Sequence, residues 1–144
     1  MMKYFYIQPE VAGGLGENTV MDRSVHPPIV SKLHYAFDGW GGDVLLRSFP
    51  CLIVTEDAKK KLQSVGLTGM RFDKVEVTTS EFFQDRYPNL QLPKFVWLQV
   101  AGKPGQDDFG FVQDARLLVS ERALKVLEGL GISNALVTPF DEGQ

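Results

Sequence analysis

The 144-residue sequence contains one cysteine, Cys51, so it cannot form an intramolecular disulfide. A disulfide-free chain of this length is typical of a reducing compartment. No apolar run approaches the ~20 residues that a membrane span needs, and the run near the N-terminus is too short for a signal-peptide core. These absences predict a cytoplasmic protein without membrane attachment.

The sequence has no excess of basic residues either. Its Lys and Arg number 15 against 18 Asp and Glu, which gives a net charge of −3 and a pI near 5.3. A protein that binds a nucleic-acid backbone needs a basic face, so nucleic acid is not an expected partner. Apolar residues make up 44% of the chain, which is enough for one core in a chain of this length. We therefore expect a single domain over residues 1–144.

Residues that commonly carry catalysis or hold metals are scarce. Cys51 directly precedes a predicted buried strand, where a thiol packs as a small apolar side chain. A nucleophile–base pair of Cys51 with His34 is the alternative that would give chemistry. His26 and His34 have no clear set of further ligands around them, whereas zinc needs three or four. The sequence predicts no catalytic residue, no metal site and no cofactor.

Apolar patterning and turn signals predict an α+β fold with one mixed or antiparallel sheet of about five or six strands and two principal helices. The spacing Thr78-Thr79-Ser80-Glu81 predicts a further short helix that ends near Tyr87. The glycine-rich stretch 13–16 and the polar stretch 18–28 are expected to be loops. The predicted strands lie near Tyr4–Ile7, Leu33–Phe37, Leu52–Val54, Phe72–Val77 and Lys94–Ala101.

A strand–helix–strand unit occurs twice, at about residues 51–77 and 116–140. A shift of 65 residues aligns 52–66 with 117–131, with seven identities and one hydroxyl-for-hydroxyl match in fifteen positions. Thr55 and Ser120 are expected to cap the two helices, and Gly66 and Gly131 to end them. Two interpretations remain open. In the first, the two units are similar lobes of the protein. In the second, the likeness is coincidental, because any strand followed by a cap, a helix and a terminating glycine has a similar sequence.

Large aromatic residues in or beside loops are the least ordinary feature. Trp40 lies between Asp38-Gly39 and Gly41-Gly42, so we predict that it anchors a protein partner; the alternative is a lid over the end of the sheet. In the loop 102–110, Asp107 and Asp108 are predicted to steer a basic partner. The aromatic residues in such positions are Trp40, Phe82, Phe83, Tyr87 and Trp97.

Three segments, Val25–Trp40, Phe49–Val77 and Asp107–Phe140, together resemble a bacterial group of uncharacterised proteins. Some of that group are immunity proteins encoded beside polymorphic toxins. The resemblance implies a protein-binding module, most concretely an immunity-type inhibitor of a bacterial toxin. Such families often carry Cys-x-x-Cys metal motifs, and this chain has none. The alternative function is a small enzyme or small-ligand binder whose site is assembled from distant polar residues.

Overall fold

The computed structural model describes residues 3–140, and in this range thirteen strands, three α-helices and one 3-10 turn are present. Mixed strands and helices confirm the α+β class, but the strands form four sheets rather than one. The elements are β1 (Tyr4–Gln8), β2 (Gly13–Leu15), β3 (Val20–Asp22), β4 (Ile29–Lys32), β5 (His34–Phe37), β6 (Leu45–Ser48), β7 (Cys51–Thr55), α1 (Glu56–Val65), β8 (Met70–Asp73), β9 (Glu76–Thr79), α2 (Glu81–Arg86), β10 (Phe95–Val100), β11 (Phe109–Val112), η1 (Gln113–Ala115), β12 (Arg116–Ser120), α3 (Glu121–Leu130) and β13 (Leu136–Pro139).

Two four-stranded antiparallel sheets have the same topology. One has the order β6-β7-β10-β8 and the other β11-β12-β1-β13. We call β6, β7, α1, β8 and β10 the first unit, and β11, β12, α3, β13 and β1 the second unit. In each unit a helix connects the second strand to the fourth, and the third strand comes from elsewhere in the chain. The two units therefore correspond strand by strand, over a longer stretch than the sequence pattern covers.

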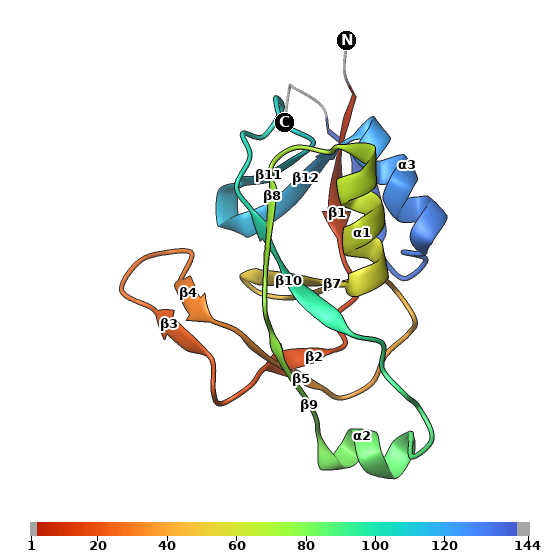
Figure 1. The fold of residues 1–144 in the computed structure, drawn as a ribbon. Coiled ribbons are helices and arrows are strands. Elements are labelled where there is room, and N and C mark those ends of the chain that lie inside the picture. The colour runs from red at the N-terminus through yellow and green to blue at the C-terminus, as the bar shows by residue number, and fades with distance from the viewer. Residues whose placement is uncertain (1–2, 141–144) are drawn as a thin grey trace.

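The helix boundaries in the two units follow the predicted signals. The hydroxyls of Thr55 and Ser120 accept hydrogen bonds from the backbone N–H three residues later, at 3.1 and 3.2 Å. Gly66 and Gly131 stand at the C-caps with φ of 79° and 121°. The cap predictions are confirmed at all four positions. The two helices lie side by side (Figure 1) and bury their apolar faces in one core with the inner faces of both sheets.

A third sheet, β2-β5-β9, covers the face of the first unit that points away from α1. Tyr35 and Phe37 of β5 pack there against Ile53 and Trp97 in a second core. The glycine-rich stretch forms the edge strand β2 and is not the expected loop. The close approach of the two strands requires glycine at position 13, because a Cβ there would collide with the backbone oxygen of Ala36 in β5.

The fourth sheet is a two-stranded arm, β3–β4, that projects from the body (Figure 1). The polar stretch expected to be a loop therefore contributes strand β3 and the turn of this hairpin. At its tip His26 Nε2 lies 2.8 Å from Asp114 Oδ1 of η1, which ties the arm to the second unit. A groove of about 400 Å³ lies between the arm and the body.

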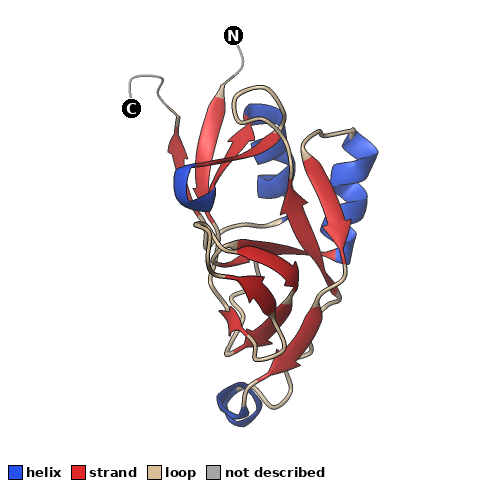
Figure 2. Cartoon of the chain, turned by 90° about the vertical axis from the view of Figure 1, so that its left-hand side faces the viewer, coloured by secondary structure: helices blue, strands red, loops and turns tan. Residues whose placement is uncertain are grey.

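The predicted short helix, α2, is present, but it begins two residues later than the capping-box spacing indicates, because Thr78 belongs to strand β9. Ser80 is its N-cap, and its hydroxyl accepts a hydrogen bond from the N–H of Phe83 at 3.1 Å. In Figure 2, α2 lies at the opposite end of the molecule from α1 and α3. None of the helices within residues 3–140 is long and apolar enough to cross a membrane.

Candidate partner-binding surface

The turn that carries Trp40 is held firmly in place. The indole Nε1 donates to the backbone oxygen of Asp43 at 2.9 Å, and the ring meets Phe95 edge to face at 6.0 Å between centroids. The carboxylate of Glu10 accepts from the backbone N–H groups of Gly41 and Asp43. Trp40 is half-buried as a result. One part of the ring closes the second core, as the lid alternative expects, and the rest is accessible.

Exposed aromatic side chains lie on and beside α2, and one of them, Tyr87, borders this turn. Phe82 is 58% exposed and Tyr87 is 39% exposed. Gly39 faces the Tyr87 ring, because a Cβ at that glycine would lie 3.5 Å from Tyr87 Cε2. A shallow groove of about 460 Å³ adjoins the helix and is lined by Phe83, Tyr87, Pro88, Leu90 and Leu92, among others.

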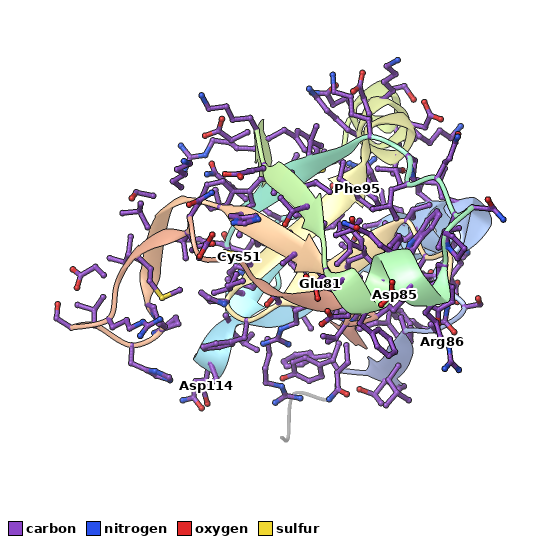
Figure 3. All side chains as sticks on the ribbon, turned by 90° about the horizontal axis from the view of Figure 1, so that it is seen from below. Cys51, Glu81, Asp85, Arg86, Phe95 and Asp114 are labelled. Carbon is purple, nitrogen blue, oxygen red and sulfur yellow. The ribbon has the colours of Figure 1, made fainter. Side chains whose placement is uncertain are left out.

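Carboxylates lie on the same two elements, Asp38 on the turn and Glu81 and Asp85 on α2. Asp38, Glu81 and Asp85 are exposed, and within residues 3–140 none of them is in an ion pair. Figure 3, viewed from below, shows α2 toward the viewer with Glu81, Asp85 and Arg86 labelled on it. We define the α2 rim as Asp38, Trp40, Glu81, Phe82, Asp85 and Tyr87.

Asp108 is not the exposed steering charge that the sequence predicts, because its side chain is only 3% exposed. Its carboxylate accepts from Arg122 Nε and Nη2 at 2.9 and 2.8 Å, from the Ser120 hydroxyl and from the Thr68 backbone N–H. Burial alone would raise the pKa of Asp108, but these hydrogen bonds and the Arg122 charge lower it to about 2. Asp108 therefore holds α3 and the loop after α1 together.

Asp107 is half-buried, and its carboxylate accepts from the backbone N–H of Lys103 at 2.7 Å. It lies far from Trp40. The strand β10 begins at Phe95, beside Trp40, and ends just before the loop with Asp107. A six-residue strand spans about 20 Å. The structure thus does not bring Trp40 into one patch with Asp107 and Asp108, and partner contacts by any of the three remain a prediction.

Cys51 and His34 do not form a catalytic pair. Burial raises the pKa of the Cys51 thiol to about 12, so the thiol stays protonated and weakly nucleophilic at neutral pH. His34 uses both ring nitrogens elsewhere, with Nε2 2.7 Å from Thr78 Oγ1 and Nδ1 accepting from the Asn18 N–H. In the part of the chain that the structure describes, no three His, Cys, Asp or Glu side chains are grouped to hold a metal ion.

Comparisons with known proteins add no family to this picture. No protein-family model matches the chain, and no curated protein matches it. The resemblance to bacterial immunity proteins therefore stays a prediction, and any function must be argued from the surface itself.

Proposed function

We propose that this protein is a protein-binding module, most concretely an immunity-type inhibitor of a bacterial toxin, and that the α2 rim is its contact surface. The observation that carries the proposal is the exposure of Phe82 and Tyr87 on and beside α2, with Tyr87 next to the turn that holds Trp40. Aromatic side chains are enriched among the residues that dominate binding energy in protein interfaces. Here they stand on a short helix and a fixed turn, so little ordering is needed on binding.

The charges of the rim indicate what kind of partner fits. Asp38, Glu81 and Asp85 are exposed carboxylates, and Arg86 is the single cation on α2. The groove beside α2 offers apolar side chains from Phe83 and Leu90. A partner segment with exposed basic residues around an apolar centre would match both features. Such charge complementarity mainly speeds encounter and selects the partner, while the aromatic contacts supply affinity.

The test is binding kinetics against the product of the neighbouring gene. Phe82→Ala removes an exposed ring, so we expect a folded variant that binds at least about 2 kcal/mol more weakly. Val20→Ala is the matched control, because Val20 is similarly exposed (54%) but lies on β3. Glu81→Gln with Asp85→Asn should slow association, and the effect should shrink at high salt.

Trp40→Ala is the riskier variant, because the indole is also packed against Phe95. If Trp40→Ala unfolds the protein, Trp40 is mainly a lid over the core, and the Phe82→Ala variant alone tests the contact surface. Unchanged binding by well-folded Phe82→Ala and Tyr87→Ala variants would remove the α2 rim from the interface. A neighbouring product that does not bind the wild-type protein would contradict the inhibitor proposal itself.

The groove under the β3–β4 arm supports the alternative of a small-ligand binder. Its volume of about 400 Å³ is within the ~300–1,000 Å³ range of small-molecule sites. Trp97 lines it together with Arg71 and Gln99, which could orient a polar group. A small molecule that raises the melting temperature of the wild type but not of Arg71→Gln would favour this function over partner binding.

A further inference from the structure

Part of the outer face of the second unit lacks the cover that the first unit has, although Leu118 on this face is buried. Ile7 and Leu117 point to the core beneath α3, so the alternating residues Tyr6 and Arg116 face the other way. In the first unit the corresponding face is sealed by β2-β5-β9. In the second unit the loop 101–108 reaches only the end near Gly110, where Pro104 lies close. The end of this face that carries Tyr6 and Arg116 is open.

Two arginines border a small pocket on this open end. Arg116 Cζ lies 3.9 Å from the centroid of the Tyr6 ring, and Arg47 Cζ lies 5.6 Å from that of Phe49. Each guanidinium thus rests on an aromatic ring, which limits its conformations. Both line one cavity of about 70 Å³, whose other walls include polar Gln8 and Thr138.

Neither guanidinium is neutralised by a carboxylate of residues 3–140. No carboxylate in this range lies within ion-pair distance of Arg47 or Arg116, and neither side chain donates a hydrogen bond there. The nearby carboxylates are engaged, since Asp114 pairs with His26 and Glu10 accepts from the Trp40 turn. Partial burial lowers the pKa of Arg47, as expected for a cation that has lost water without gaining an anion.

We propose that the Arg47–Arg116 pocket binds a single carboxylate, supplied by an acidic side chain of a protein partner. Two guanidinium groups offer the paired N–H donors that carboxylates accept, and Gln8 and Thr138 can complete the hydrogen bonds. The cavity is far below the size of small-molecule sites, so it holds one functional group rather than a whole metabolite. Exposed Leu136 at its lip suits a carboxylate that arrives on an apolar segment. This site is built from other elements than the α2 rim and does not depend on it.

The pocket can be tested without knowing the partner. The probe is the methylamide of N-acetylglutamate, whose one charge is a side-chain carboxylate, added to ¹⁵N-labelled protein at constant ionic strength. The Nε–Hε signals of Arg47 and Arg116 should shift together and saturate at about 1–10 mM. Arg47→Gln and Arg116→Gln should each weaken this binding roughly tenfold or more. Arg86→Gln, on α2, is the matched control and should leave it unchanged.

Three outcomes would overturn the proposal. Equal shifts with the neutral glutamine analogue would show that the carboxylate is not recognised. Tighter binding of inorganic phosphate than of the glutamate probe would assign the pocket to phosphate instead. The third outcome is that Asp141→Asn with Glu142→Gln moves the two arginine signals in the absence of probe, which would make the chain's own carboxylates the occupant. Because none of these experiments involves Phe82 or the neighbouring gene, their failure leaves the proposed function untouched.

Discussion

The two units share their strand order and helix caps but differ in what lies on their outer faces. In the first unit this face carries Ile53 and Trp97, both buried under a third sheet. In the second unit the corresponding strands carry Leu118, which is buried, and Tyr6, which is half-buried and contacts Arg116 and Phe140. The shared strand–helix pattern therefore specifies the inner core, whereas the surfaces that could contact partners arise where the units diverge.

The units are also joined in a nearly reciprocal way. Asp43 precedes β6 and accepts from the backbone N–H of Asn134, in the loop after α3, at 2.9 Å. Asp108 precedes β11 and accepts from the N–H of Thr68, in the loop after α1, at 2.9 Å. Each buried carboxylate thus accepts a hydrogen bond from a backbone N–H in the loop that follows the other unit's helix. The difference is that Asp108 also pairs with Arg122, while Asp43 has no cation partner within residues 3–140.

Among matched substitutions in the two units, the losses of unfolding free energy should differ most at the corresponding strand positions Trp97 and Tyr6. Trp97→Ala empties a site between two sheets and should cost about 3–5 kcal/mol of unfolding free energy. Tyr6→Ala removes a half-buried ring and should cost about 1 kcal/mol. Urea denaturation of both variants gives the comparison. Equal losses would mean that the second unit's outer face is packed as tightly as the first.

The next largest effect should come from the two buried carboxylates. Asp108→Ala leaves Arg122, Ser120 and Thr68 without their acceptor and should cost about 3 kcal/mol. Asp43→Ala removes only hydrogen bonds from the uncharged donors of Asn134 and should cost about 1–2 kcal/mol. Chemical denaturation at pH 7 measures both. A larger loss for Asp43→Ala would mean that the Arg122 pair contributes nothing.

The pH dependence of stability separates the role of charge at Asp108 from that of packing. Its pKa is about 2 in the folded protein, against about 3.9 when unfolded. Because the folded value is lower, the contribution of Asp108 is fully present above pH 4 and is lost as the pH falls toward 2. The wild type should lose about 2 kcal/mol more than Asp108→Ala over this window. Parallel pH profiles of the two proteins would contradict the ion pair.

The same contrasts separate the features that the sequence predicts from those that it does not. The caps at Thr55, Ser80 and Ser120 are local, because each hydroxyl bonds an N–H three residues away. The sequence predicts Thr55 and Ser120, whereas the capping-box spacing indicates Thr78 in place of Ser80. The pairing of β1 with β12 and of β10 with β7 joins strands far apart in the chain, so the division into four sheets was not predictable from periodicity.

The candidate sites also depend on contacts between residues far apart in the sequence. Asp108 looks like a loop charge in the sequence, because its acceptor role depends on Thr68, 40 residues earlier. Arg47 and Arg116 carry no shared motif. Two long-range contacts bring them to one pocket: β6 bridges to Glu10, just after β1, and β1 pairs with β12. The aromatic residues of the α2 rim are the exception, since large rings beside turns are visible in the sequence itself.

Removing the helix caps should lower the unfolding free energy by smaller amounts, and the loss should differ between the two units. Thr55→Ala removes one cap hydrogen bond and should cost about 1 kcal/mol. Ser120→Ala removes the same bond and also the donor to Asp108, so about 2 kcal/mol is expected. Thermal and urea unfolding of the two variants, made in the same background, measure the gap. Identical losses would imply that the Ser120–Asp108 hydrogen bond adds no stability.

Tyr4 of the second unit corresponds to Phe95 of the first, because each lies opposite the cap residue of its unit. The smallest change in stability is expected from a substitution at Tyr4. Within residues 3–140 the Tyr4 hydroxyl is the one buried side-chain polar atom without a hydrogen-bond partner. Burying such a group costs free energy, so Tyr4→Phe should be neutral or stabilising by up to about 1 kcal/mol. Burial, with Asp108 and Asp107 nearby, raises the pKa of Tyr4, so the wild type should also lose stability relative to Tyr4→Phe as the pH rises above about 10. Urea denaturation at pH 7 and at pH 10.5 measures both effects. A Tyr4→Phe variant that is clearly less stable at pH 7 would show that the hydroxyl has a partner, and that this end of the second unit is not merely an apolar copy of the first.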